Sequence, residues 1–173
     1  MRKRLSILIL MSVFLIAGFS ACQTGENTMI NENRQSEPKN IILIIGYGMG
    51  FAQLNAAIDR SKEKLNMESA EFSGMSKTHS STHKITDSAA AGTAIATGRK
   101  TKNGVIGQDT LGNEFETILE IAERYGLSTG LVSTSRITHA TPASFIAHEL
   151  SRNAYEAIAG DFLDTDIDVF IGG

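Results

Sequence analysis

A serine that could act as a nucleophile stands at the expected start of a helix. The segment 86–94 reads TDSAAAGTA, and its small residues predict a helix over residues 88–97 with Asp87 at or near the N-cap. Ser88 would then lie where free backbone N–H groups and the positive end of the helix dipole favour an anion. This position suits a serine that attacks a phosphoryl group, and the phosphoserine that results. A serine hydroxyl is a poor nucleophile at neutral pH, so Ser88 would need a base or a metal ion such as zinc.

The same segment has a purely structural interpretation, in which Asp87 caps a helix of small residues that packs closely. Other nucleophile and phosphate-loop motifs fit the sequence poorly. Ser88 lacks the G-x-S-x-G pattern of α/β-hydrolases. The turn GYGMG at 46–50 follows an apolar run, as a dinucleotide loop would, but its glycines are spaced G-x-G-x-G. Residues 92–101 resemble a Walker A loop only faintly, because the spacing is wrong and a helix is expected there.

Alternating apolar and polar segments predict the elements that would position these residues. The β-branched run NIILII at 40–45 ends in glycine and predicts a strand covered on both faces, as in a parallel sheet. Further strands are predicted at 72–78, 128–133 and 168–171. Helices are predicted at 51–60, 88–97, 114–125 and 142–150, with a glycine-rich loop at 101–112 and Pro142 in the first turn of the last helix. Strands that alternate with helices predict an α/β fold, a three-layer α/β/α sandwich with a mostly parallel central sheet.

The composition restricts the class of protein. The chain has 173 residues and a single cysteine, which fits one domain or part of a larger one and excludes a disulfide framework. A net charge of −3 gives no basic footprint for nucleic acid. With 6% aromatic residues and no tryptophan, the chain offers no obvious stacking platform for bases. Nucleic acid is therefore not expected among its partners.

The N-terminus predicts export. Three basic residues precede an apolar stretch at 5–19, which has the length of a secretory signal and is too short to favour a membrane-spanning helix. Small residues then precede Cys22, an arrangement that resembles a bacterial lipobox, although Phe19 stands where leucine is usual. We therefore predict a signal peptide at 1–21, lipidation of Cys22, and a flexible polar tether over 22–39. The protein would be lipid-anchored in the cell envelope and face the periplasm; an ordinary signal peptide with an incidental cysteine is the alternative.

Four segments together resemble the N-terminal part of alkaline phosphatase. They are NIILIIGYGMG at 40–50, the stretch at 83–107 that contains TDSAAAGTA, the stretch at 116–148, and SRNAYE at 151–156. They occur in the family's order and with matching separations, and they cover most of residues 40–173. The resemblance implies an alkaline-phosphatase-like catalytic domain over this range.

The resemblance also implies roles for individual residues. Ser88 matches the serine that becomes phosphorylated and contacts one zinc ion, and Asp87 matches the aspartate that orients an arginine. Arg152 matches that arginine, whose planar guanidinium holds two phosphate oxygens. Thr141 matches a hydroxyl ligand of magnesium, and His139 lies in the shell around that ion. The implied reaction is hydrolysis of phosphate monoesters at alkaline pH through a phosphoserine, with two Zn²⁺ and one Mg²⁺, in an enzyme that is often a homodimer.

Taken singly, three of these residues have plain structural interpretations. Arg152 alone would be a solvated surface charge, and His139 alone would be a hydrogen-bonded loop histidine. Thr141, which precedes Pro142, would be a helix N-cap. Only the joint pattern favours the functional interpretation.

The sequence departs from the family at Tyr47. The family turn reads Gly-Asp-Gly-Met-Gly, and its aspartate bridges one zinc ion and the magnesium ion; here tyrosine takes that place. A phenol offers one oxygen and has a pKa of about 10, so it does not replace a bridging carboxylate. We therefore expect weakened binding at two of the three metal positions.

The chain is also shorter than is usual for the family, and the remaining metal ligands of the family lie beyond the matched part. None of its four histidines, His79, His83, His139 and His148, aligns with a zinc-binding histidine. A zinc site with three or four ligands is therefore not expected, and a truncated sheet would expose an edge and apolar surface. Three hypotheses follow: the front part of a phosphatase, an inactive truncated relic, and a lipoprotein that binds phosphate without turnover.

Overall fold

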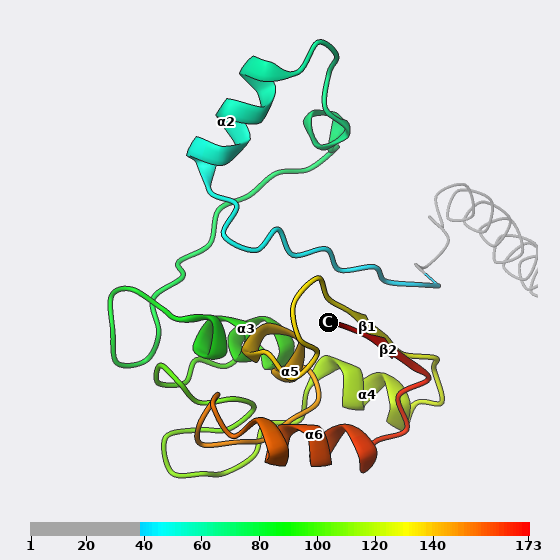
Figure 1. The fold of residues 1–173 in the computed structure, drawn as a ribbon. Helices are drawn as coiled ribbons and strands as arrows, with labels where there is room; N and C mark the ends of the chain where they lie inside the picture. The colour runs from blue at the N-terminus through cyan, green and yellow to red at the C-terminus, as the bar shows by residue number, and fades with distance from the viewer. Residues whose placement is uncertain (1–38) are drawn as a thin grey trace, which may run out of the picture. The chain divides into compact units, whose positions relative to one another are not determined.

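The computed structural model describes residues 39–173, which divide into two units: residues 39–69 are the described part of the first, and Ala70–Gly173 form the second. The predicted signal peptide, the lipidation of Cys22 and nearly all of the tether fall outside the described residues. Within 39–173 no helix has the length and apolar character needed to cross a membrane. The described part of the first unit contains helix α2, Phe51–Arg60, and a short 3-10 helix, Asn66–Ser69 (Figure 1). The helix predicted at 51–60 is therefore confirmed.

The strand predicted at 40–45 is wrong. In the structure this segment belongs to no helix or strand, and Ile41, Ile42 and Ile44 are 80%, 85% and 86% exposed. A strand exists only where a neighbour accepts and donates its backbone hydrogen bonds, and β-propensity alone does not supply that neighbour. The strand predicted at 72–78 is wrong for the same reason, since it has no strand partner in the described part of the chain.

Helix α3, Ser88–Thr97, begins and ends where the sequence predicts (Figure 1). Asp87 is its N-cap, and the Asp87 Oδ1 accepts a hydrogen bond of 3.0 Å from the Ala90 N–H. Gly98 ends the helix with a φ of 71°, a left-handed conformation that glycine adopts without steric cost. Local capping signals at both ends therefore fix the position of this helix.

Helix α4, Ile118–Arg124, is shorter than the helix predicted at 114–125. It begins after a capping box, in which the Thr117 Oγ1 accepts from the Glu120 N–H and the Glu120 carboxylate accepts from the Thr117 N–H. These two bonds satisfy N–H groups that have no acceptor within the helix, so the helix starts at Ile118. Gly126 follows the helix with a φ of 68°, a left-handed conformation that favours glycine after the end of a helix.

The helix predicted at 142–150 is wrong in extent. Helix α5 covers Ala140–Ala143 and is followed by turns, with His139 at its N-cap. Pro142 is the third residue of α5, where a backbone N–H would have no acceptor within the helix, so proline is tolerated. Helix α6, Tyr155–Leu163, was not predicted, although it buries Ile158 and Phe162, a pair at helical spacing.

The sheet contains two parallel strands, β1 Gly130–Val132 and β2 Val169–Ile171. They confirm the strands predicted at 128–133 and 168–171, and they confirm parallel pairing across a helical connection. The described residues therefore form only a two-stranded sheet, packed with helices. They do not form the complete three-layer sandwich that the sequence predicts. Phe162 of α6 packs against Phe170 of β2, with ring centroids 5.2 Å apart.

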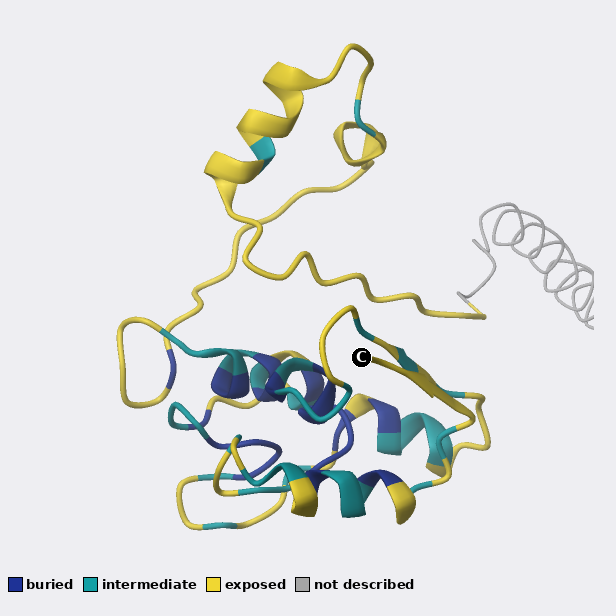
Figure 2. Cartoon of the chain, in the orientation of Figure 1, coloured by how far each residue is buried: buried dark blue, intermediate teal, exposed yellow. Residues whose placement is uncertain are grey.

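The core of the second unit lies between the helices, as the buried positions of α3 and α5 show in Figure 2. A close approach in it joins Gly92 of α3 and Ser144, which follows α5. A Cβ atom on Gly92 would lie 2.7 Å from the Ser144 Oγ and 2.9 Å from the Ser144 Cβ. The Ser144 hydroxyl is within hydrogen-bond distance of the Ala140 and Ala89 carbonyl oxygens, at 2.6 and 3.3 Å. This contact holds the first turn of α3 beside α5.

The close contact predicts an unusual sign for one helix substitution. Glycine to alanine within a helix usually stabilises it by about 1 kcal/mol. Gly92→Ala should instead lower the free energy of unfolding, because the new methyl group overlaps Ser144. Urea unfolding of the full chain measures the change. Gly160→Ala in α6 is the matched control and should stabilise, since nothing lies within 4 Å of its added Cβ. If both substitutions stabilise the protein, the close contact between Gly92 and Ser144 is contradicted.

Candidate active site

An ion pair joins two of the residues singled out in the sequence. The Arg152 Nη1 lies 3.1 Å from the Asp87 Oδ2, and the two side chains are 25% and 24% exposed. Asp87 is the N-cap of α3, whereas Arg152 lies in the turn that precedes α6. The structure therefore brings together residues that are 65 positions apart in the chain. A partly buried, charge-assisted pair of this kind fixes the orientation of a guanidinium better than an exposed pair does.

Two residues that the sequence analysis did not single out also hold this pair. The Gly104 N–H donates to the Asp87 Oδ2 at 3.0 Å, and the Arg152 N–H donates to the Gly104 carbonyl oxygen at 2.8 Å. The Asp87 N–H donates to the Asn103 Oδ1 at 3.3 Å. The Asn-Gly dipeptide within the predicted loop is a turn signal, but it does not reveal which residues the turn contacts.

Ser88 is the first residue of α3 and directly follows the paired Asp87. It is half-buried, and the ten-residue helix behind it directs free N–H groups and a partial positive charge toward this end. The predicted place of Ser88 at a helix N-terminus is confirmed. Its predicted roles, phosphorylation and contact with zinc, stay predictions.

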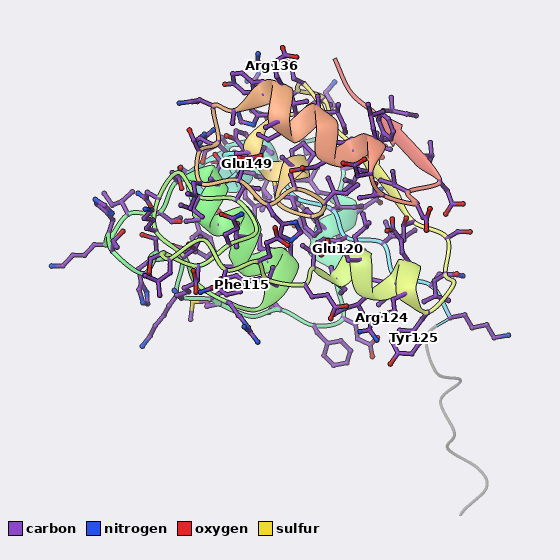
Figure 3. The ribbon with its side chains drawn as sticks, turned by 90° about the horizontal axis from the view of Figure 1, so that it is seen from below. Phe115, Glu120, Arg124, Tyr125, Arg136 and Glu149 are labelled. Atoms are coloured by element: carbon purple, nitrogen blue, oxygen red, sulfur yellow. The ribbon has the colours of Figure 1, made fainter. Side chains whose placement is uncertain are left out.

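His139 lies on the other side of Arg152. The Arg152 Nη2 donates to the His139 Nε2 at 3.4 Å. Burial and the positive charges of Arg152 and Arg136 lower the pKa of His139 below its ordinary value of 6.5, so the ring is neutral at pH 7 and accepts this bond. Arg136 itself lies over the Tyr155 ring, 4.1 Å from its centroid, at the start of α6 (Figure 3).

The other two predicted site residues are placed as follows. Thr141 is the second residue of α5, next but one to His139, and it is half-buried. His139, and not Thr141, is the N-cap of α5, so the structural interpretation of Thr141 is wrong. Tyr47 belongs to the first unit, in a turn closed by a 3.0 Å bond from the Met49 N–H to the Gly46 carbonyl oxygen, and its side chain is 61% exposed.

The metal ligands implied by the sequence do not form a complete site. Among residues 39–173 no group of three or more His, Cys, Asp and Glu side chains is arranged to hold a metal ion. The Asp87 carboxylate already accepts three hydrogen bonds, and the His139 Nε2 accepts from Arg152. Ser88 and Thr141 would add only hydroxyls. These residues alone therefore do not fit a zinc or magnesium ion, which needs more ligands.

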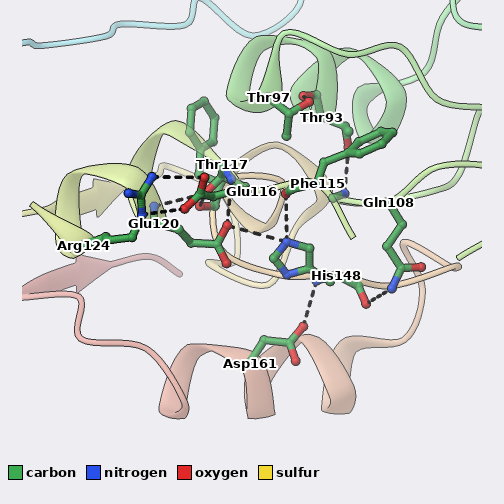
Figure 4. A network of polar contacts seen from close by, with 12 residues as sticks. Thr93, Thr97, Gln108, Phe115, Glu116, Thr117, Glu120, Arg124, His148 and Asp161 are labelled. Atoms are coloured by element: carbon green, nitrogen blue, oxygen red, sulfur yellow. Dashed lines mark hydrogen bonds and ion pairs between the residues drawn. The ribbon is translucent and has the colours of Figure 1, made fainter. Parts of the chain in front are cut away.

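A second polar cluster surrounds His148 and connects the loop after α3 to α4 and α6 (Figure 4). The His148 N–H donates to Asp161 at 3.1 Å, and its carbonyl oxygen accepts from Gln108 at 2.6 Å. The His148 Nε2 lies 3.1 Å from the Phe115 carbonyl oxygen and 3.6 Å from the Glu120 carboxylate. These contacts fix the backbone on which the loop rests.

The loop itself is closed by a short antiparallel bridge. The Ile106 N–H donates to the Glu149 carbonyl oxygen at 2.8 Å, and the Glu149 N–H donates back at 2.9 Å. Both Val105 and Ile106 are fully buried. The bridge therefore ties the loop that carries Asn103 and Gly104 to the segment that leads to Arg152.

The fold and these contacts define an α/β protein in which an aspartate holds an arginine and directly precedes a serine at a helix N-terminus, an arrangement that suits phosphate. The profile of the alkaline phosphatase family matches residues 38–170, and the chain belongs to this family. The match covers the N-terminal catalytic region of the family.

Relatives and solved structures agree with this assignment. Alkaline phosphatase 4 of Bacillus subtilis is 37% identical over 190 residues, covering 100% of this chain and 41% of that protein. Alkaline phosphatase of Escherichia coli is 39% identical over 145 residues, covering 76% and 31%. The enzyme of the Antarctic bacterium TAB5 superposes with a TM-score of 0.69 at 41% identity, covering 71% and 36%. A mutant of the TAB5 enzyme with Mg bound gives a TM-score of 0.71 at 40% identity, covering 73% and 36%. The chain thus spans about two fifths of the length of the Bacillus relative.

The bridging residue Glu149 predicts a pH dependence of stability. Burial, and to a lesser degree the charge of Asp161, raise the pKa of the Glu149 carboxyl above its ordinary value of 4.5. The folded state therefore keeps this proton to a higher pH than the unfolded state, and stability falls as pH rises above 4.5. Glu149→Gln should raise the free energy of unfolding at neutral pH, and the gain should shrink in acid.

Urea unfolding at both pH values measures this difference. Glu71→Gln, in an exposed loop of the same unit, is the matched control and should show no such gain. If the gain for Glu149→Gln is the same in neutral and acid conditions, the raised pKa of the Glu149 carboxyl is contradicted.

Proposed function

We propose that this chain serves in the hydrolysis of phosphate monoesters, through a phosphoserine formed at Ser88. The observation that carries the proposal is the Asp87–Arg152 ion pair, which holds a guanidinium against the residue directly before Ser88. Membership of the alkaline phosphatase family supports the same reaction. Because the chain spans only part of its relatives' length, the activity of the whole enzyme is a proposal for this chain.

Arg152 is suited to bind the substrate. A guanidinium has five N–H donors in a fixed plane, and here Asp87 and His139 each accept from one of its two terminal nitrogens. Other donors of Arg152 are left to bind two oxygens of a phosphate group, in the bidentate geometry that arginine favours. The N-terminus of α3 would add partial positive charge from the side of Ser88.

The proposed reaction has two covalent steps. The Ser88 oxygen forms a bond to phosphorus while the bond from phosphorus to the ester oxygen breaks, and the hydroxyl proton leaves to solvent or to the departing alkoxide. Water then attacks the phosphoserine, which releases inorganic phosphate and restores the hydroxyl. Arg152 would offset part of the negative charge on the phosphoryl oxygens, and so would assist both steps.

Two zinc ions and one magnesium ion complete this proposal by analogy with the family. Ser88 and Thr141 would supply hydroxyl ligands, with His139 nearby and Tyr47 at the position of the family's bridging aspartate. The TAB5 structure with Mg bound supports magnesium in the family. The described residues of this chain do not complete such a site, so its other ligands would have to come from elsewhere.

A second candidate function is phosphate binding without turnover. It is favoured by the contrast between a formed Asp87–Arg152 pair and the lack of a metal-binding cluster among residues 39–173. A serine hydroxyl without a metal ion or base is too weak a nucleophile for rapid transfer. The inactive relic is the limiting case, in which neither binding nor turnover occurs.

Titration of the full chain with inorganic phosphate tests the binding site. Calorimetry should give saturable binding for the wild type and for Ser88→Ala, and Arg152→Ala should weaken it by at least about tenfold. Arg124→Ala is the control, because its guanidinium pairs with Glu116 at 2.9 Å and lies over the Tyr125 ring (Figure 3). No saturable binding, or equal losses in the two arginine variants, would overturn the proposal.

Turnover is tested separately with zinc and magnesium added. Hydrolysis of p-nitrophenyl phosphate, with acid trapping of radioactive phosphate on Ser88, would support the phosphoserine mechanism. Phosphate trapped on another residue would contradict the role of Ser88. Binding without hydrolysis would favour the second candidate function.

We also propose that the protein is exported, anchored through Cys22 so that it faces the periplasm, and assembled as a homodimer. The first two proposals rest on the sequence pattern and the third on analogy with the family. Cys22→Ser should abolish incorporation of labelled palmitate and release the protein from the membrane fraction. Lipid incorporation that persists in Cys22→Ser would contradict the anchor. Sedimentation equilibrium of the protein without its lipid distinguishes a monomer from a dimer.

A further inference from the structure

We infer that Asn103 and Gly104 are positioning residues. They hold the Asp87 carboxylate and Arg152 in a fixed arrangement at the start of α3, where Ser88 lies. They come from the loop that follows α3 and do not themselves offer a group to phosphate. This inference deepens the proposed function and rests on it, because the geometry that the two residues maintain is that of the proposed phosphate site. Four hydrogen bonds carry the argument.

Asn103 holds the backbone that leads into α3. The Asn103 Oδ1 accepts from the Asp87 N–H at 3.3 Å, and the Asn103 Nδ2 donates to the Ile85 carbonyl oxygen at 3.1 Å. One amide side chain therefore satisfies a donor and an acceptor on either side of Thr86. These contacts fix the direction in which the chain enters the helix, and so the position of the N-cap carboxylate.

Gly104 connects the two members of the ion pair. Its N–H donates to the Asp87 Oδ2 at 3.0 Å, and its carbonyl oxygen accepts from the Arg152 N–H at 2.8 Å. The N–H and the C=O of this one residue thus contact Asp87 and Arg152, respectively. Gly104 has a φ of 89°, which a residue with a Cβ adopts only with strain. This conformation directs both groups toward the pair.

The loop is rigid enough to act in this way because its next residues are anchored in the core. Val105 and Ile106 are 0% exposed. The Thr93 hydroxyl of α3 donates to the Val105 carbonyl oxygen at 3.4 Å and accepts from the Gly107 N–H at 3.0 Å. The loop is therefore attached to α3 itself, so the position of Gly104 is set relative to the same helix that carries Ser88.

Both the backbone and the side chain of Arg152 are consequently held in place. Its backbone is bonded to Gly104, and its guanidinium is bonded to Asp87, which Gly104 and Asn103 hold in turn. Removal of the Asn103 amide should leave the fold intact, because the buried anchors of the loop remain. It should instead widen the range of orientations that the guanidinium samples, and so weaken phosphate binding.

The test uses the full chain labelled with ¹⁵N-arginine and the variant Asn103→Ala. The Arg152 side-chain signal is assigned by its absence in Arg152→Lys. In the wild type without phosphate, this N–H signal should be sharp and exchange slowly with water, and in Asn103→Ala it should broaden or vanish. Phosphate affinity should fall by about tenfold, the size of effect expected when one ordinary hydrogen bond that supports the site is lost.

Two further variants separate positioning from general stability. Asn113→Ala removes an amide that bonds to Asp109 at 2.7 Å in the same loop region, and it should leave both the Arg152 signal and phosphate affinity unchanged. Asn103→Asp keeps an acceptor for the Asp87 N–H but loses the donor to Ile85, and it should retain more of the Arg152 signal than Asn103→Ala.

The outcomes are distinct. An Arg152 signal in Asn103→Ala that matches the wild type would overturn the inference, as would the same change in Asn113→Ala. A wild type that shows the protected signal but binds no phosphate would overturn the proposed function and leave the positioning role supported. A protected signal lost in Asn103→Ala, together with weaker phosphate binding, supports both.

Discussion

The partly buried carboxylate of Asp87 needs hydrogen-bond donors from the protein, and this need determines how the described site is built. Asp87 has two oxygens in a position where water reaches them only in part, so each needs protein donors. The donors come from the first turn of α3, from the loop at Gly104 and from Arg152. Three segments of the chain therefore meet at a single side chain, and its loss would leave an arginine and two backbone N–H groups without this acceptor.

This arrangement depends on how closely α3 lies against α5. Small side chains cover the contact, and Gly92 leaves room for Ser144. The close approach brings the N-terminus of α3, which starts at Ser88, into the same region as the N-terminus of α5, where His139 and Thr141 lie. The ten-residue helix α3 supplies partial positive charge at this end, which favours an anion, and Arg152 bonds to the N-cap residues of both helices.

Features encoded by adjacent residues could be predicted from the sequence, and features that depend on distant partners could not. The bounds of α3 and its N-cap aspartate were predicted, and the glycine that follows the helix is its C-cap. The run at 40–45 has the right composition for a strand, but pairing depends on a neighbour, and the prediction was wrong. The roles of Asn103 and Gly104 were missed because nothing local indicates that a loop will reach back to Asp87. The Asp87–Arg152 pair was anticipated only through the joint family pattern.

The separation of Asp87 and Arg152 along the chain has a consequence for the order in which the molecule acquires its structure. Helix α3 and its cap involve neighbouring residues and can form early, whereas the ion pair must close a loop of 65 positions. Loop closure over that length gains nothing until the intervening turns and α5 are in place. If the proposed phosphate site forms, its geometry depends on this long-range closure, and an anion that binds only the folded chain would stabilise it, so that ligand supply would influence the yield of folded protein.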